Sequence, residues 1–341
     1  MRVLHLTSKP PDFQAEHAQQ ALARELGADF ELVARQLGQK QTGRNPLSSY
    51  WWLRNRTHDF DVIHAWDFPS ARLACSARLG VIFSPAQGLN AGQLSWLKWM
   101  ARHRDLQIVC PSEAHREAFV RSGFPEHQLH SALLPVQISD VKARDESVRQ
   151  SLGLAREDRV LLAPGESVRS AGHQYALWAA SILHVLDPRW RLLVWGRGPQ
   201  VRALQALAQK FEQPRVLCVA EQLLGRRIPF ESLLPASDLA LITPSGLAPP
   251  LAIQMCVAAG LAMVASASPM TNELLRDQEN AAVVPRLSPR LLAQRVLALS
   301  EDDDARRKLS ENARKIRSAT GARFVEIFRS LYRECAQNIS R

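Results

Sequence analysis

Two histidines stand out as side chains that could move a proton or bind a ligand. His64 lies at the end of an expected strand, Asp61 to Ala65, and His173 lies near the start of an expected helix. Histidine titrates near neutral pH and acts as a general base, a proton shuttle or a metal ligand. The commoner role at such places is structural, with hydrogen bonds to a neutral ring. We therefore expect both histidines to be structural.

The cysteines and the acidic residues indicate no metal or redox centre. The five cysteines stand at positions 75, 110, 218, 256 and 335, with no Cys-x-x-Cys pair, and most lie in apolar runs. This pattern is typical of reduced, buried thiols in a cytoplasmic protein. No group of His, Cys, Asp or Glu in the sequence has the spacing of metal ligands. We expect no metal and no cofactor.

Composition favours an ordinary globular protein with two domains. The chain has 341 residues, 46% of them hydrophobic and 22% charged, and one core rarely extends beyond about 250 to 300 residues. The N-terminus turns polar at Thr7, and the longest apolar stretch, Leu251 to Ala265, is shorter than the roughly 20 residues of a membrane span. The net charge of +10 comes from scattered basic residues, without an aromatic RNA-binding signature. We expect a cytoplasmic protein, soluble or peripheral at the inner membrane face, with no nucleic acid partner.

Short apolar runs alternate with helical stretches along the whole chain. This order predicts parallel sheets with helices on both faces, whose strands are apolar throughout. In the first half the runs are Val3 to Thr7, Phe30 to Ala34, Asp61 to Ala65, Val81 to Ser84 and Gln107 to Cys110, with Leu133–Leu134 as a sixth candidate. In the second half they are Val160 to Ala163, Arg191 to Trp195, Val216 to Val219, Leu239 to Thr243, Ala262 to Ala265 and Ala282 to Val284.

A polar, aperiodic segment separates the two halves. It predicts a linker at residues 138–150 between two doubly wound, Rossmann-like α/β domains, residues 1–137 and 151–320. Helical segments at 289–300, 304–317 and 323–335 close the chain. Two such domains facing a central cleft place a ligand at the carboxyl ends of their strands.

Five blocks of sequence have the order and spacing seen in the family 4 glycosyltransferases. They are Asp61 to Asp67, Ile108 to Glu113, Leu193 to Pro199, Ala236 to Ala240 and Ala258 to Ser266. The chain resembles this family over nearly its whole length. The resemblance implies the GT-B fold, with an acceptor-side first domain, a nucleotide-side second domain and a last helix, residues 321–341, that crosses back to the first domain. It also implies retaining sugar transfer, of the hexosyltransferase type, from a nucleotide-diphosphate sugar to a glycan or lipid-linked acceptor.

The same resemblance places the donor site, where several positions are altered. An Arg and a Lys that neutralise the pyrophosphate in the family correspond to Glu166 and Ala171, although a leaving pyrophosphate needs cations or helix N-termini. Two carboxylates that contact the sugar and the ribose correspond to Leu247 and Met255. The nucleotide-side candidates that follow are Gly165, Glu166, Arg169, Gly196, Ser245 and Gly246.

The first domain departs from the family in the same way. The candidates for its side of the cleft are Glu16, Gln87 and Gly88. Glu16 and the residue before it are what remains of a Gly-Gly-x-Glu turn. Gln87 stands where the family has His, and it can form hydrogen bonds but cannot take up a proton.

Two functions remain open. The favoured one is a relative that no longer transfers sugar and acts as a binding or accessory protein, with an active glycosyltransferase as a partner. The alternative is an active transferase with a rebuilt site, in which Arg169 replaces the lost cation and Glu166 lies near the sugar. Arg169 is otherwise a solvated loop residue.

A tryptophan-rich segment, residues 96–104, allows weak contact with a membrane surface. One helical face carries Trp96, Trp99, Met100 and His103, and the remainder carries Lys98, Arg102 and Arg104. Such a helix can lie on anionic lipid, but the favoured interpretation is a helix that faces the core. The same two interpretations apply to Trp51 and Trp52.

Overall fold

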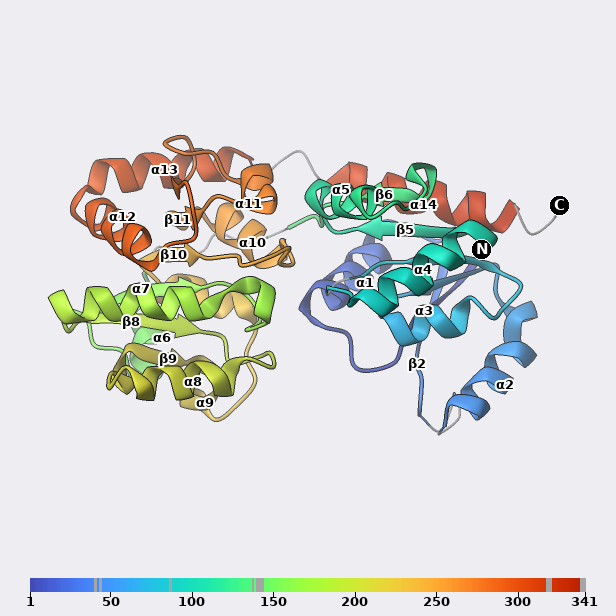
Figure 1. The fold of residues 1–341 in the computed structure, drawn as a ribbon, viewed down its shortest axis with the longest axis horizontal. Helices are drawn as coiled ribbons and strands as arrows, with labels where there is room; N and C mark the ends of the chain where they lie inside the picture. The colour runs from blue at the N-terminus through green and yellow to red at the C-terminus, as the bar shows by residue number, and fades with distance from the viewer. Residues whose placement is uncertain are drawn as a thin grey trace. The chain divides into compact units, whose positions relative to one another are not determined.

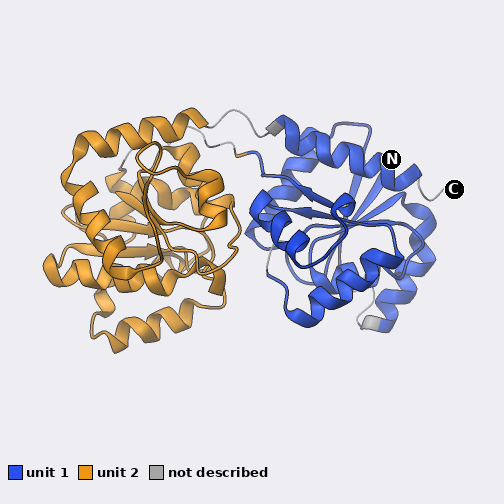
Figure 2. Ribbon diagram, turned by 45° about the horizontal axis from the view of Figure 1, so that its top comes forward, with its two compact units in different colours: residues 1–135, 319–341 blue, residues 136–318 orange. Residues whose placement is uncertain are grey.

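Each alternating half of the sequence folds into an α/β unit in the computed structural model. One unit contains residues 1–135 and 319–341, and the other contains residues 136–318 (Figure 2). The structure describes residues 1–39, 42, 45–85, 88–136, 138, 144–316 and 321–337. Within these ranges each unit has a six-stranded parallel sheet between layers of helices (Figure 1). The predicted class, two Rossmann-like parallel-sheet domains, is confirmed.

The sheet of the first unit has the strand order β2-β1-β3-β4-β5-β6. Its strands are β1 (Arg2–Thr7), β2 (Glu31–Gln36), β3 (Val62–Ala65), β4 (Gly80–Phe83), β5 (Leu106–Cys110) and β6 (Leu129–Ser131). The helices of this unit are α1 (Phe13–Glu25), α2 (Pro46–Arg56), α3 (Phe68–Ala74), α4 (Ala91–His103), α5 (Glu113–Arg121) and α14 (Gly321–Gln337).

Alternate side chains of these strands point to opposite faces, and both faces are covered. On one face Leu6 and Ile63 pack with Leu97 of α4 and with residues of α2 and α3. On the other face His64 stacks against Phe328 of α14. Burial on both sides explains why the central strands are apolar runs without alternation.

The sixth strand lies earlier in the chain than the sequence predicted. We expected Leu133–Leu134, whereas β6 is Leu129–Ser131. This strand stands at the edge of the sheet, where it pairs with β5 alone. An edge strand needs no continuous apolar run, so the hydrophobic pattern was a poor guide there.

The sheet of the second unit has the strand order β12-β11-β10-β7-β8-β9. Its strands are β7 (Arg159–Ala163), β8 (Trp190–Val194), β9 (Leu217–Val219), β10 (Leu239–Ile242), β11 (Met263–Ser266) and β12 (Ala282–Val284). The helices are α6 (Glu146–Ser151), α7 (His173–Leu186), α8 (Val201–Lys210), α9 (Ala220–Leu224), α10 (Leu251–Ala259), α11 (Pro269–Leu274), α12 (Pro289–Glu301) and α13 (Asp303–Lys315).

The strand order of this sheet reverses between β7 and β10. Connections leave these neighbouring strands in opposite directions, so the loops after them diverge and leave a crevice at the carboxyl edge. In open α/β sheets such a switch point is the usual place for a ligand. The second unit therefore has a candidate site where the loops after β7 and β10 begin.

The predicted linker, residues 138–150, overlaps a helix of the second unit. Its last residues form most of α6 (Glu146–Ser151). The reason is Arg149, whose side chain is fully buried and donates to the carbonyl oxygens of Ala236 and Asp158. The sequence alone could not predict this buried residue, because an arginine in a polar, aperiodic segment is usually exposed to solvent.

Candidate functional site

Three loops make up the candidate site at the carboxyl edge of the second sheet. We call them the switch-point loops, residues 164–172 after β7, 195–200 after β8 and 243–250 after β10. Two hydrogen bonds join the loops after β7 and β10. Ser245 Oγ donates to the carbonyl oxygen of Arg169 at 2.7 Å, and the backbone amide of Ser245 donates to the carbonyl oxygen of Ser170 at 2.9 Å. The structure thus brings Arg169 and Ser245 together.

Glycine allows these loops to pack backbone against backbone. Gly172 has a φ of +67°, and a Cβ atom there would stand 1.9 Å from the carbonyl oxygen of Thr243. A Cβ atom on Gly198 would stand 2.6 Å from the carbonyl oxygen of Ser167. No side chain fits at either position, so the relative placement of the three loops depends on both glycines.

His173 supports the loop after β7 rather than serving as a base. Its ring is buried, with Nδ1 3.0 Å from Ser167 Oγ and Nε2 3.2 Å from the carbonyl oxygen of Pro164. Burial lowers the pKa of His173 to about 4. The ring is therefore neutral at pH 7, and the structural role expected from the sequence is confirmed.

The charged candidates of these loops differ in exposure. Arg169 is exposed, and its guanidinium forms no ion pair or hydrogen bond with another described residue. Glu166 is partly buried, and Ala171 offers no charge. Arg197, next to Gly196, is already occupied: its Nε donates to Glu221 at 2.9 Å and its guanidinium stands 4.2 Å from the centre of the Trp195 ring.

The two positions expected for carboxylates lie on and just before α10. Met255 is 3% exposed and belongs to the core. Leu247 is partly exposed, and the neighbouring Ser245 and Gly246 are exposed. All of α10 is buried, so the side chain of Met255 packs in the core of the second unit.

Sequence reasoning missed two features of this edge. The helices α7 and α10 both begin here without a side-chain cap, and a helix N-terminus attracts anions. Ser266, the last residue of β11, has a buried hydroxyl that bonds to no other described residue. Pro249–Pro250 before an apolar run was a usable signal for the start of α10, because proline is favoured at helix starts. No sequence signal marks Ser266.

The described candidates of the first unit lie on α1 and in the segment between β4 and α4. Glu16 is exposed in the first turn of α1, and Gly88 is exposed with open space around its Cβ position. Gln87 lies outside the described residues. The loops after β1 and β3 meet where Asp67 accepts bonds from the amide and the hydroxyl of Ser8, at 2.6 and 2.9 Å.

His64 belongs to a buried group that we call the histidine–tyrosine cluster, made of His5, His64, Ser84 and Tyr332. The Tyr332 hydroxyl lies 2.7 Å from Nδ1 of His64 and 3.2 Å from Nε2 of His5, and Nε2 of His64 lies 2.8 Å from Ser84 Oγ. Burial lowers the pKa of His64 well below its ordinary value and that of His5 to about 3. Both rings are neutral, and His64 is structural as expected.

The tryptophan-rich helix does not present the single face that we predicted. In α4, Met100 is 7% exposed and packs in the core with Leu97, whereas Trp99 is 56% exposed. Trp96 is partly buried and packs edge-on against Phe68. The apolar residues cover more of the helix circumference than one stripe, so some of them are buried in the core and others are exposed to solvent.

The described ranges include neither a helix suited to span a membrane nor a cluster of metal ligands. No helix there is both long and apolar enough to cross a bilayer. No group of three or more His, Cys, Asp or Glu in those ranges is placed to hold a metal ion.

The sequence of the second unit identifies the family. Residues 144–316 match the family "glycosyl transferases group 1", and the chain belongs to this family. No curated protein sequence matches it.

Solved structures of GT-B glycosyltransferases share the fold. HepE from Anabaena, crystallised with UDP-glucose, is 16% identical and has a TM-score of 0.78 over 100% of this chain and 99% of its own. Sucrose-phosphate synthase from Thermosynechococcus elongatus is 14% identical, with a TM-score of 0.74 over 98% of each chain. WaaG, a glycosyltransferase involved in lipopolysaccharide biosynthesis, is 16% identical, with a TM-score of 0.70 over 95% of this chain and 99% of its own.

Proposed function

We propose that this glycosyltransferase relative, close in type to family 4, no longer transfers sugar and acts as a binding or accessory protein. The observation that carries the proposal is the buried Met255. It is 3% exposed within α10, at a position where a carboxylate would contact the nucleotide sugar. The thioether of methionine is only a weak acceptor and cannot accept the hydrogen bonds of a ribose or a sugar as a carboxylate does.

The cation side of the site supports the same proposal. Ala171 has no charge where a pyrophosphate needs one, and Glu166 brings a carboxylate into the same loop. Losing one charged hydrogen bond to a diphosphate costs about 1.5 to 3 kcal/mol. Two such losses and a repelling acid weaken binding of the donor by several powers of ten.

A nucleotide-diphosphate sugar remains the class of ligand to test first. HepE, a structural neighbour, has been crystallised with UDP and with UDP-glucose. The uncapped starts of α7 and α10 retain some attraction for a diphosphate. Residual binding without transfer is compatible with an accessory role beside an active glycosyltransferase.

An active transferase with a rebuilt site is the second candidate, and Arg169 favours it. Its guanidinium is exposed, and the loop that carries it is fixed by the bond from Ser245 Oγ to its carbonyl oxygen. From there it could contact a phosphate in place of a cation at position 171. Glu166 would then be the carboxylate near the sugar.

Calorimetric titration with UDP, GDP, ADP and their common sugar conjugates separates the two candidates. The unaltered chain is compared with Arg169→Gln, with the double variant Glu166→Arg and Ala171→Lys, and with Arg202→Gln, an exposed arginine on α8, as the charge control. The proposal expects no micromolar binding by the unaltered chain and a gain in the double variant. Micromolar binding that Arg169→Gln abolishes and Arg202→Gln leaves intact would establish a rebuilt site.

A weak peripheral contact with anionic lipid is a separate proposal. It is supported by Trp99, which is 56% exposed, together with the exposed Arg102 and His103 on the same helix. Flotation with anionic vesicles is expected to retain the chain and to lose it in Trp99→Ala. Equal recovery of both proteins from neutral and anionic vesicles would contradict the contact.

A further inference from the structure

The second unit has a pocket at the edge of its sheet opposite to the switch-point loops. Its volume is about 620 Å³, and its lining includes Arg159, Trp190 and Leu239, the first residues of β7, β8 and β10. The switch-point loops follow the last residues of these strands. Strands of this length, at about 3.3 Å per residue, separate the two edges by roughly 15 Å. The pocket is therefore distinct from the candidate site at the switch-point loops, and it is large enough for a small molecule.

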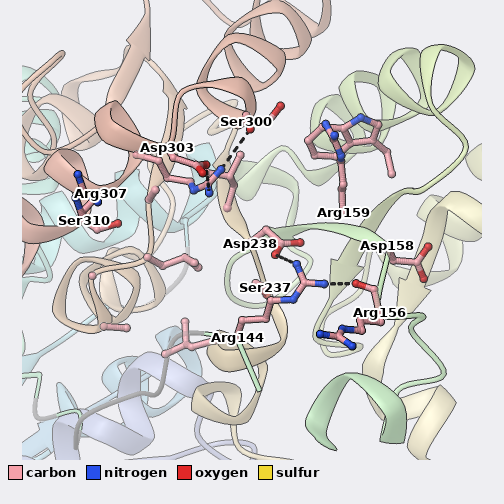
Figure 3. Close-up of a pocket in the computed structure, with 18 of the residues that line it drawn as sticks. Arg144, Arg156, Asp158, Arg159, Ser237, Asp238, Ser300, Asp303, Arg307 and Ser310 are labelled. Atoms are coloured by element: carbon pink, nitrogen blue, oxygen red, sulfur yellow. Dashed lines mark hydrogen bonds and ion pairs between the residues drawn. The ribbon is translucent and has the colours of Figure 1, made fainter. Parts of the chain in front are cut away.

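Arginines line this pocket from two walls, as Figure 3 shows for some of them. Arg144, Arg156 and Arg159 come from the segment that leads into β7, and Arg306, Arg307 and Arg314 come from α13. The carboxylates of the lining are Glu157, Asp158, Asp238 and Asp303. Six positive and four negative side chains leave two positive charges in excess.

Two of the six arginines lack a carboxylate partner among the described residues. Arg156 is exposed and forms no ion pair with another described residue. Arg314 has no carboxylate partner among the described residues either; its Nε donates to the carbonyl oxygen of Ala259 at 3.3 Å. Each of the two guanidinium groups can therefore bind an anionic group of a ligand.

The other four arginines already form ion pairs. Arg144 lies 3.2 Å from Asp238, and Arg306 lies 2.5 Å from Asp303. Arg159 and Arg307 pair with Asp187 and Asp304, outside the pocket lining. The pair of Arg306 and Asp303 is exposed, and exposed ion pairs contribute little to stability, so exchanging the Asp303 carboxylate for a phosphate oxygen costs little.

Helix ends explain only part of this cluster. The amino edge of a parallel sheet collects helix C-termini, whose carbonyl groups attract cations. Arg314 bonds to the end of α10 in this way, and Arg306 donates to the carbonyl oxygen of Ser300 near the end of α12 at 3.3 Å. Arg156 bonds to no helix end in the described ranges, and its positive charge is one of those that lower the pKa of Glu146.

We propose that this pocket binds a small anion that bears phosphate and at least two negative charges. The planar guanidinium group matches phosphate oxygens with two parallel hydrogen bonds. Ser310 adds a hydroxyl on the wall formed by α13, and Trp190, with Arg159 5.4 Å from its ring centre, closes the other side. The proposal does not depend on whether the switch-point loops bind a nucleotide sugar.

Calorimetric titration of the full chain with inorganic pyrophosphate, orthophosphate and glucose 6-phosphate tests this site. Ionic strength is held at about 0.15 M so that the screening of charges by salt is constant. Arg156→Gln and Arg314→Gln are each expected to weaken binding of the preferred anion about tenfold or more. The double variant Lys210→Gln and Arg215→Gln removes two charges outside the pocket and is expected to leave affinity unchanged. Comparison of the three anions distinguishes free phosphate, pyrophosphate and a sugar phosphate as the source.

Three results would overturn the proposal. One is the absence of binding heat with all three anions. Another is an equal loss in the Lys210 and Arg215 control, which would mean diffuse attraction by the net charge. The last is a loss in Arg169→Gln alone, which would place the anion at the switch-point loops. Arg156→Gln decides the outcome even if Arg314→Gln lowers stability, because Arg156 is exposed and unpaired with described residues.

Discussion

The hydroxyl of Tyr332 lies 2.7 Å from Nδ1 of His64, and this contact joins α14 to β3 across 268 positions of the sequence. Both side chains are fully buried. Burial also raises the pKa of Tyr332 well above its ordinary value, so the phenol and the imidazole meet as neutral groups. The last helix of the chain is thus fixed to the first unit by a specific polar contact as well as by apolar packing.

Replacing Tyr332 by Phe is expected to lower the free energy of unfolding by about 1 to 3 kcal/mol, because His5 and His64 each lose a buried hydrogen-bond partner. Urea denaturation at pH 7 measures the change. Tyr50→Phe is the control, since its hydroxyl accepts a bond from Arg54 on the surface of α2, and a change below about 0.5 kcal/mol is expected there. Equal effects of the two substitutions would mean that the cluster adds no specific stability.

Acidification from pH 7 to pH 5 is expected to destabilise the protein through its buried histidines. Burial holds the pKa of His5 at about 3 and that of His173 at about 4, whereas both return to about 6.5 on unfolding. The unfolded chain therefore takes up these protons first. The stabilising contribution is complete above about pH 6.5 and is lost as the pH falls toward the folded pKa values.

The loss at pH 5 amounts to about 2 kcal/mol for each of these histidines. Urea titrations at the two pH values measure it, because Asp and Glu remain largely ionised throughout this interval. His173→Gln is expected to reduce the difference between the two pH values, and His58→Gln, an exposed control, to leave it unchanged. Identical unfolding free energies at both pH values would contradict the prediction.

Gly80→Ala is expected to loosen α14. A Cβ atom on Gly80 would stand 2.7 Å from Cβ of Cys335 and 2.8 Å from its carbonyl oxygen. Such overpacking costs about 1 to 3 kcal/mol and should expose α14 to limited proteolysis. Gly92→Ala in the first turn of α4 is the control, because its nearest neighbour is 3.5 Å away and alanine favours helix. Unchanged cleavage of α14 in Gly80→Ala would show that the helix can shift at no cost.

Arg149→Met is expected to destabilise the second unit by about 3 to 5 kcal/mol, the usual cost of removing one partner from a buried charged network. The guanidinium donates to the carbonyl oxygens of Ala236 at 3.0 Å and Ala155 at 3.3 Å, and to the carboxylate of Asp238 at 3.3 Å. Thermal unfolding compared with Arg202→Met, an exposed arginine on α8, measures the difference. Similar midpoints for both variants would assign Arg149 no anchoring role.

The sequence predicted the central strands of both sheets because those strands are buried on both faces. Val160 to Ala163 was predicted from its apolar run alone, and it corresponds to β7 (Arg159–Ala163). The position predicted for the edge strand β6 was wrong. This strand pairs with one neighbour only and does not need a continuous run of apolar residues. The single apolar face predicted for α4 from its periodicity was also wrong, because Trp99 is exposed to solvent and Met100 is buried in the core.

The sequence by itself determined the two parallel α/β units, because continuous apolar runs predict strands that are buried on both faces. It also determined that no acidic side chain stands at positions 247 and 255. Only the tertiary structure decided which polar groups meet. Tyr332 contacts His64, Ser245 bonds to Arg169, and Arg156 and Arg314 line the same pocket. These pairs lie far apart in sequence, and packing of whole helices and sheets brings them together, which no local pattern of residues encodes.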